Sequence, residues 1–201
     1  MSQSLAKDFN FRSLLKFAFP SIIMMIFMSL YSIVDGFFIA QYVDSMALSA
    51  ANIVYPAVSI LLAVGIMFGT GGSAFVAAKI GQGKQEEANR NFSALTLTTL
   101  IIGILGAVLG NLFCRQICSL LGATPVLMDY GIAYLRTILS FAPVCLLQAL
   151  FQSFFVTAGR PGLGLSLTVS AGITNMLLDY LFVVPFHLGV AGAALATGLG
   201  Q

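Results

Sequence analysis

The run GLGLSLTVSAGITNMLLDYLFVV, residues 162–184, is long and apolar enough to cross a lipid bilayer as one helix. About 20 predominantly apolar residues span the hydrocarbon core. The run is followed by Pro185, which lacks the backbone N–H that would continue a helix. The sequence therefore predicts a membrane-spanning helix here, and Asp179, deep inside it, needs a physical explanation.

Further apolar runs lie on both sides, separated by short polar connections. The connection KIGQGKQEEANR, residues 79–90, holds five charged residues and two glycines, which predicts a water-exposed loop. The segment CRQICSLLGATP, residues 114–125, predicts a turn region, and its LLGATP, residues 120–125, predicts a break at the membrane interface. The predicted spans are 14–40, 50–78, 92–113, 127–156 and 162–184, with an incomplete sixth at 189–201 that is too short to cross.

The composition favours a membrane protein over a soluble one. Of the 201 residues, 59% are hydrophobic and 8% are charged, whereas soluble domains carry about 25% charged residues. The net charge of +2 is small and scattered, which excludes the basic patch of a nucleic-acid-binding protein. We therefore expect an all-α, polytopic transmembrane helix bundle.

Lysine and arginine are divided unequally between the two sides that alternating spans define. Seven fall on the side of the amino terminus and two on the other. Because Lys and Arg accumulate in cytoplasmic loops, we expect a multi-pass protein of the cell (inner) membrane with a cytoplasmic amino terminus. The seven are Lys7, Arg12, Lys16, Lys79, Lys84, Arg90 and Arg160, and the two are Arg115 and Arg136.

Small residues at four-residue spacing predict close packing of the helices. Gly65 and Gly69 form a GxxxG pair that Ser73 continues, and Gly106 and Gly110 form another. Such spacing lets helix backbones approach each other in a membrane. The motif indicates a packed bundle and carries no information on a substrate.

The three cysteines, Cys114, Cys118 and Cys145, predict ordinary apolar packing. None forms a CxxC pair, and they make no disulfide framework. Cys114 and Cys118 share a helix face, but the single His in the chain leaves a transition-metal site poorly supplied with ligands. We expect no bound cofactor.

The informative residues are the polar ones inside the apolar runs. Asp35 lies in the first run and Asp179 in the fifth, and a carboxylate at the centre of a membrane helix costs about 2.5–3.5 kcal/mol on insertion scales. Tyr31 and Asn175 each precede one of these acids by four residues, which places them on the same helix face. The other polar candidates are Tyr134, Gln148, Gln152 and Thr197.

Two acids without an intramembrane Lys or Arg need a proton, a cation or water. An unpaired carboxylate becomes protonated in an apolar setting, and two acids that face one water-filled cavity can bind H⁺ or Na⁺. Asn175 and Thr197 would add neutral oxygen ligands, which hard cations prefer. For the tyrosines, the glutamines and Thr197, hydrogen bonding between helices is an equally good interpretation.

These residues resemble the signature of the multidrug and toxic-compound extrusion (MATE) family. Residues 175–182, NMLLDYLF, match NxxLDxxF, and residues 189–197, GVAGAALAT, match GxxGAAxAT. Pro20, the VDG at 34–36 and the AGRP at 158–161 also fit, in the order that the family uses. Where the family often has Pro after the fifth-helix Asp, this chain has Tyr180, which puts a proline-dependent bend of that helix in doubt.

The resemblance implies one six-helix lobe, the amino-terminal one, of a two-lobed, 12-helix transporter, with its sixth helix truncated. The resemblance is to the DinF-like branch of the family. It implies that four residues form a cation-coupling site, which would hold Na⁺ if the protein is sodium-coupled: Asp35, Asn175, Asp179 and Thr197. Tyr134 falls where a cavity tyrosine is expected. The implied activity is secondary active efflux of amphiphilic or cationic organic compounds in exchange for H⁺ or Na⁺, and not an enzymatic reaction.

Other functions are compatible with two membrane acids. A lipid-linked oligosaccharide flippase of the same superfamily would line its cavity with several Arg or Lys, whereas these spans lack buried cations. An intramembrane aspartyl protease would pair YD with GxGD, whereas the flanks here are IVDG and LLDY. A non-transporting membrane scaffold would tolerate Asp35→Asn and Asp179→Asn.

The expected partners are the lipid bilayer, a small drug-like substrate, and either a carboxy-terminal lobe or a second copy of the chain. A sequence that stops inside its sixth apolar run indicates a partial chain. A natural half-size protein that completes itself by dimerisation is the alternative, and nucleic acid is not an expected partner.

Overall fold

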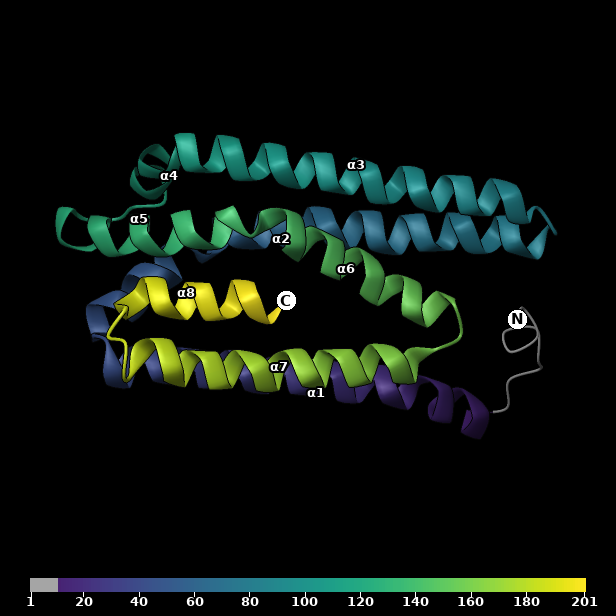
Figure 1. The fold of residues 1–201 in the computed structure, drawn as a ribbon, viewed down its shortest axis with the longest axis horizontal. Helices are drawn as coiled ribbons and strands as arrows, with labels where there is room; N and C mark the ends of the chain where they lie inside the picture. Colours follow the sequence, from purple (N-terminus) through teal and green to yellow (C-terminus); the bar gives the residue numbers. More distant parts are fainter. Residues whose placement is uncertain (1–10) are drawn as a thin grey trace.

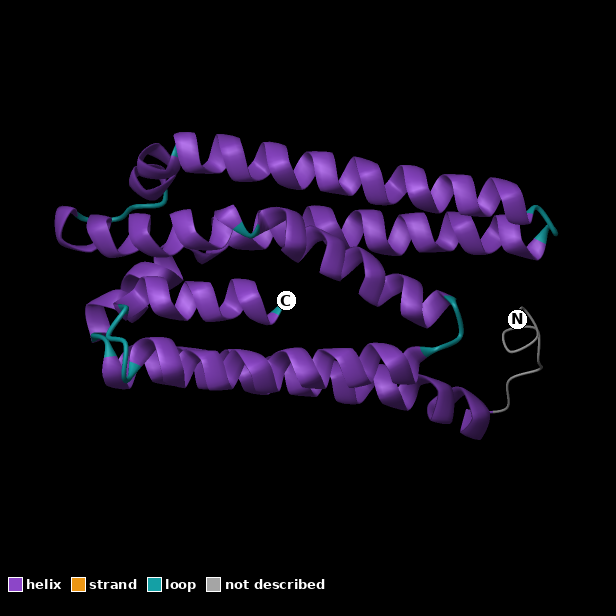
Figure 2. Ribbon diagram, viewed as in Figure 1, coloured by secondary structure: helices purple, strands orange, loops and turns teal. Residues whose placement is uncertain are grey.

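The computed structural model describes residues 11–201, which form eight α-helices and no strand (Figures 1 and 2). The prediction of an all-α bundle is therefore confirmed. The helices are α1 (Phe11–Tyr42), α2 (Ser45–Gly81), α3 (Gln85–Leu112), α4 (Cys114–Leu120), α5 (Pro125–Ser140), α6 (Ala142–Thr157), α7 (Pro161–Val183) and α8 (Gly189–Gly200).

Four of these helices, α1, α2, α3 and α7, are individually long and apolar enough to cross a membrane. The pair α5 and α6 makes a fifth span if the two are taken together, and α8 is a shorter apolar helix. The helices extend beyond the predicted apolar runs. For example, α2 continues through Lys79 to Gly81, because helical hydrogen bonding does not stop where hydropathy falls.

The predicted span over 127–156 is not straight in the structure, where it is formed by two helices that pass as one span only when taken together. Here α5 and α6 meet at Phe141 with a bend of 55°. Pro143, in the first turn of α6, has no N–H to donate to the preceding turn, and its ring excludes a straight helix. The predicted turn region 114–125 begins in the structure as the short helix α4 (Cys114–Leu120), and the chain turns into α5 only within its predicted break, LLGATP.

The helices form two groups that α8 joins. α2, α3 and the α5–α6 pair pack together, whereas α1 lies against α7 (Figure 1). The helix α8 contacts both α7 and α5, and so closes the space between the groups. Residues of both groups form the buried core that lies next to α8. Its members include Ile39, Val54, Leu135 and Val183.

Glycines mediate the closest helix contacts. A Cβ added to Gly69 would lie 2.7 Å from Ser153 Oγ, and one added to Gly103 would lie 2.5 Å from the Pro143 Cα. Gly65 contacts α6 in the same way, and Gly110 lies against Leu139 of α5. Both GxxxG pairs therefore lie at helix contacts, as predicted, and α2 can approach α6 only because these positions lack side chains.

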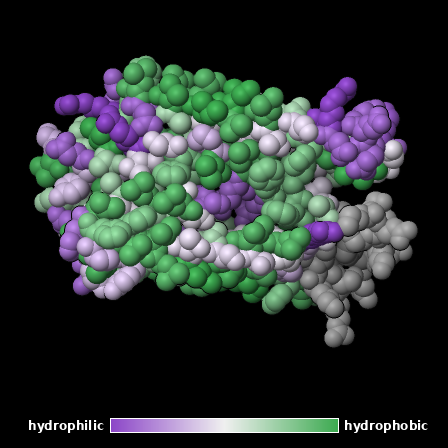
Figure 3. All heavy atoms as spheres, in the orientation of Figure 1, coloured by the Kyte–Doolittle hydropathy of each residue, from purple (hydrophilic) through white to green (hydrophobic). Residues whose placement is uncertain are grey.

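The surface has an apolar middle and two polar ends (Figure 3). Large apolar side chains are exposed on every long helix, for example Phe37, Ile60, Leu105 and Leu177. The α2–α3 connection lies at one polar end, together with the α6–α7 connection and the start of α1 (Figure 1). This arrangement is that of a multi-pass membrane protein.

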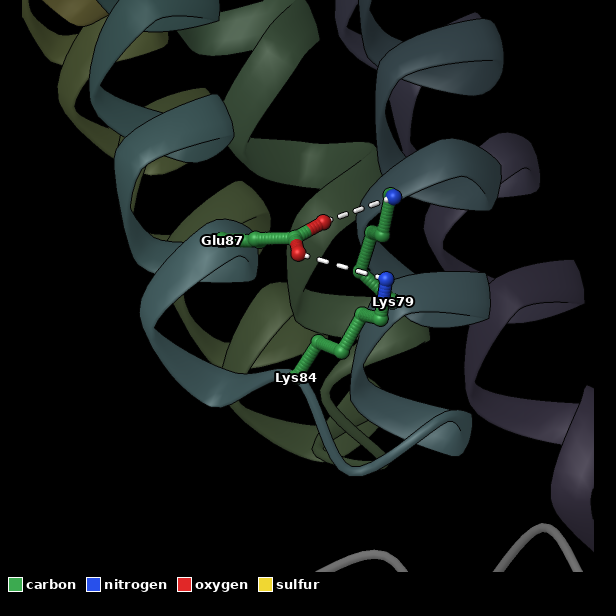
Figure 4. A network of polar contacts seen from close by, with 3 residues as sticks. All are labelled: Lys79, Lys84 and Glu87. Carbon is green, nitrogen blue, oxygen red and sulfur yellow. Dashed lines mark hydrogen bonds and ion pairs between the residues drawn. The ribbon is translucent and has the colours of Figure 1, made fainter.

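The α2–α3 connection is held by a small ion-pair network (Figure 4). Lys79 Nζ lies 2.7 Å from Glu87 Oε2, and Lys84 Nζ lies 3.3 Å from Glu87 Oε1. Gly83 makes the tight turn between the two helices, with a φ of 76° that favours glycine. Surface ion pairs of this kind contribute little to stability. The network therefore orders the connection between α2 and α3 but does not hold the bundle together.

Candidate functional site

Two carboxylates from different helices lie inside the group formed by α1, α7 and α8. Asp179 on α7 has no exposed surface, and Asp35 on α1 is partly buried. α1 packs along α7, and Gly172 of α7 lets the rings of Phe27 and Tyr31 approach its backbone. This contact brings the two helices close enough for Asp35 and Asp179 to interact.

The two acids and the neighbouring amide lack hydrogen-bond partners of ordinary geometry. Both carboxylate oxygens of Asp179, one of Asp35 and both amide atoms of Asn175 are buried without a partner among the described residues. An unsatisfied buried polar atom costs about 1–3 kcal/mol, and more when it is charged. Such a cluster fits the binding of a proton, a cation or water better than a purely structural role.

A cavity of about 240 Å³, the outer cavity, opens beside Asp35. Of the predicted site residues, Tyr31, Asp35, Tyr134 and Thr197 line it. Sequence reasoning missed further polar residues of this lining, among them Asn52 and Tyr55 on α2. They are polar side chains inside an apolar run, but without the charge that revealed Asp35.

A second cavity of about 400 Å³, the inner cavity, lies between α6 and α7. Gln148 and Gln152 line it together with Thr168 and the rings of Phe151 and Phe155. Gln152 Nε2 lies 3.5 Å from Thr168 Oγ1, which links α6 to α7. Figure 3 shows a polar hollow within the apolar surface in this part of the molecule, between α6 and the end of α8.

Between the two cavities lies a space of about 10 Å³, the constriction. Asn175 and Thr197 line it, together with Tyr31, which also lines the outer cavity, and Gln148, which also lines the inner cavity. The structure thus separates the predicted site residues into two groups. Asp35, the two tyrosines and Thr197 line the outer cavity, whereas the glutamine pair lines the inner cavity. Asn175 and Gln148 line the constriction, and Asp179 is not among the residues that line any of these three spaces.

The described residues hold no cluster of three or more His, Cys, Asp or Glu side chains that could bind a metal ion. The three cysteines are free and buried. A cation at the acid pair would therefore depend on Asp35 and Asp179 together with neutral oxygens from Asn175 and Thr197. This donor set suits H⁺ or Na⁺, and it does not suit a transition metal.

The sequence model of the MatE family matches residues 20–181, which is most of the chain and includes both acids. The chain belongs to the MatE family. This finding confirms the resemblance that the NxxLD and GAAxAT motifs indicate.

Relatives of the chain are multidrug export proteins, which are transporters and not enzymes. The multidrug export protein MepA of Staphylococcus saprophyticus is 26% identical over 195 residues, covering 97% of this chain and 43% of the relative. MepA of Staphylococcus haemolyticus is 27% identical over 191 residues, covering 95% of this chain and 42% of the relative. The chain thus spans about two fifths of the length of these MatE relatives.

Solved MATE structures share the fold of this chain. An outward-facing multidrug resistance MATE family transporter of the MOP superfamily superposes with a TM-score of 0.86 at 23% identity, over 92% of this chain and 41% of the other. A MOP superfamily transporter from Pyrococcus furiosus, described as having a binding pocket of reverse polarity, gives the same score and coverage. The helix arrangement described above is therefore one lobe of the MatE fold.

Proposed function

We propose that this chain is the amino-terminal lobe of a secondary active multidrug efflux antiporter. The transporter would export amphiphilic or cationic organic compounds and take up H⁺ or Na⁺ in exchange. Family membership supports export, and the acid pair supports ion coupling. The single observation that carries the coupling role is the unsatisfied acid pair in an apolar helix bundle: Asp179 is fully buried with neither oxygen partnered, and one oxygen of the partly buried Asp35 also lacks a partner.

The acid pair can couple an ion to a movement of the helices. Two bare carboxylates side by side in a low-dielectric setting repel each other, so a proton or a shared cation stabilises the arrangement in which α1 lies against α7. Without the ion, the repulsion favours separation of the two helices. Coupling requires this kind of differential affinity, because an ion that binds two states equally shifts neither.

We propose that Asp35, Asn175, Asp179 and Thr197 bind the coupling ion and that Tyr31, Tyr134, Gln148 and Gln152 face the substrate pathway. Thr197 Oγ1 donates to the Ala193 carbonyl at 3.1 Å, which leaves its lone pairs available to an ion. The substrate pathway would be completed by a carboxy-terminal lobe or a second copy of the chain. The expected location is the cell membrane.

The test of the coupling role compares carboxylates in different settings. The complete gene that encodes this chain is expressed in an efflux-deficient bacterium, and energy-dependent loss of a cationic dye is measured. Asp179→Asn and Asp35→Asn should abolish coupled efflux with normal membrane insertion, because the amide cannot carry the exchanged proton or charge. Asp129→Asn, which alters an exposed carboxylate on α5, is the matched control and should retain efflux. Wild-type efflux in both membrane-acid variants, at matched expression, would contradict the proposal.

We also propose that the α2–α3 connection faces the cytoplasm. Lys79, Lys84 and Arg90 lie on or beside it, and the arginine of the α6–α7 connection, Arg160, lies at the same end of the bundle. A cysteine introduced at Gln82 should be shielded from an impermeant thiol reagent added to intact cells, whereas one at Ser45 should react. The reverse pattern would overturn this orientation.

The flippase alternative receives no support from the cavities. The residues that line the outer cavity, the constriction and the inner cavity include no Lys or Arg among those described. A pyrophosphate-linked lipid would need such cations for charge compensation.

A further inference from the structure

Arg136 on α5 is an exposed cation that lies beside the junction of α3 and α4. One turn along α5, Ser140 Oγ accepts a hydrogen bond from the Asn111 side chain at 3.3 Å, which places Ser140 against the last turn of α3. One turn in the other direction, the Ile132 carbonyl accepts from the Cys114 thiol of α4 at 3.7 Å. Arg136 therefore lies at the level where α3 ends and α4 begins.

This junction is also where the apolar surface of the bundle ends. The last exposed large side chains of α3 and the residue after it are apolar, namely Leu109, Leu112 and Phe113. The first turn of α4 then exposes Arg115 and Gln116, and Figure 3 shows hydrophilic side chains gathered over α4 beside the apolar surface of α3. We therefore place the membrane interface at this level, where a guanidinium on a flexible apolar stem reaches the phosphate layer of the bilayer.

The guanidinium of Arg136 lacks an anionic partner within the described part of the chain. It makes no hydrogen bond or ion pair with any residue that the structure describes. The only acid of α5, Asp129, is seven residues away, which is about 10 Å along a helix. Neither α4 nor the last turns of α3 contain an acid. An unpaired cation at the edge of an apolar surface favours binding of an external anion.

An anionic phospholipid has the chemistry that this place requires. A guanidinium pairs with a phosphate group through two parallel N–H···O hydrogen bonds. The phosphate charge of phosphatidylglycerol is not neutralised within its own headgroup, whereas the choline of phosphatidylcholine neutralises it. The acyl chains of the same lipid would find an apolar surface on Leu109 and Leu112 of α3 and on the exposed Val144 at the start of α6.

We propose that Arg136 binds the phosphate of an anionic phospholipid whose acyl chains lie along α3. In the orientation proposed above, this lipid belongs to the outer leaflet. Its headgroup would stabilise the junction of α3, α4 and α5. The inference goes beyond the proposed antiporter function and does not depend on it, because it concerns the lipid-facing surface and not the acid pair.

The experiment measures how lipid stabilises the complete protein. The protein is purified in a neutral detergent and titrated with phosphatidylglycerol, or with phosphatidylcholine of the same acyl chains, and its thermal unfolding is followed. A ligand that binds only the folded state raises the Tm according to its occupancy, so the titration gives an apparent affinity. Phosphatidylglycerol should raise the Tm more than phosphatidylcholine. Arg136→Gln should weaken the apparent affinity for phosphatidylglycerol by about fivefold or more, because a charge-assisted, two-pronged contact is lost.

Two further variants make the result specific. Arg136→Lys, which keeps the charge but not the planar fork, should give an intermediate affinity. Arg115→Gln removes the same charge from the exposed surface of α4, beyond the end of α3, and should keep the wild-type affinity. Sodium phosphate at the same phosphate concentration should not raise the Tm, because it has no acyl chains to bind along α3.

Four results would overturn the proposal. An unchanged affinity in Arg136→Gln would show that the arginine does not hold the lipid. Equal weakening in Arg136→Gln and Arg115→Gln would show general attraction between surface charge and lipid. Equal stabilisation by sodium phosphate would identify a site for free anions. A loss of Tm in Arg136→Gln that is the same with and without phosphatidylglycerol would show that Arg136 pairs with another part of the complete protein.

Discussion

The contact between α2 and α6 and the contact between α1 and α7 differ in what lies between the helices. In the first, Gly65 and Gly69 let the backbones approach, and among the described residues no buried side-chain polar atom of α2 or α6 lacks a hydrogen-bond partner. The second also uses a glycine, Gly172, but it encloses buried carboxylates that lack partners. One interface is built for close packing, and the other keeps polar groups available for a ligand.

This difference predicts opposite responses to mutation. Helices in a membrane gain their mutual stability from packing and not from apolar burial, so the α2–α6 interface should be sensitive to side-chain volume. The α1–α7 interface contains groups that are costly to bury, so its polar residues should be dispensable for folding and essential for function.

The largest stability effect is expected for Gly69→Leu. A Cβ there would lie 2.7 Å from Ser153 Oγ and 2.8 Å from the Ala149 carbonyl oxygen, and the backbone oxygen cannot move aside cheaply. Over-packing of this kind costs about 1–3 kcal/mol or more. Thermal unfolding of the purified complete protein, followed by size-exclusion chromatography, should show a marked loss of stability.

Gly71→Leu is the matched control for that variant. Nothing lies within 4 Å of a Cβ at Gly71, although it is in the same helix. The control should therefore unfold at the wild-type temperature. Equal destabilisation by both substitutions would show that helix propensity and not interface packing decides stability in α2.

A smaller effect of the opposite sign is expected for Asp179→Leu. The substitution removes two buried, unpaired carboxylate oxygens and replaces them with an apolar group of similar size. Stability should rise by about 1–3 kcal/mol, while coupled efflux is lost. Val183→Asp, one turn along the same helix at a position only 2% exposed, should instead destabilise the protein. A clear loss of stability in Asp179→Leu would show that the acid is structural. The α1–α7 interface would then depend on its residues for stability in the same way as the α2–α6 interface.

The sequence was sufficient to predict the helical class and the membrane setting, because hydropathy over 20 residues reports directly on the solvent of a helix. It was not sufficient for the bend at Phe141. Pro143 signals that a helix is disturbed, but a proline in a membrane helix can produce a gentle kink, a sharp bend or none, and neighbouring helices decide which. The short helix α4 was missed because seven residues carry too little periodicity.

The sequence was sufficient to identify individual residues of the candidate site, but not their arrangement around the cavities. Asp35 and Asp179 stand out as charges in apolar runs, and spacing placed Asn175 on the face of Asp179. The division into two cavities could not be predicted, because it depends on how α8 closes the space between α5 and α7. Asn52 was overlooked because an uncharged residue near the beginning of a span is ordinary in a membrane helix, and only the cavity beside Asp35 gives it significance.

The bend at Phe141 also has a consequence for biosynthesis. While the ribosome is still making α7, α5 and α6 can already pack against α2 and α3, and Pro143 lies against Gly103 of α3. The ring of Phe141 is later covered by Gly198 of α8, which lies well downstream in the chain. We therefore expect the packing around Phe141 at the bend to be completed only after α8 has been synthesised and has docked.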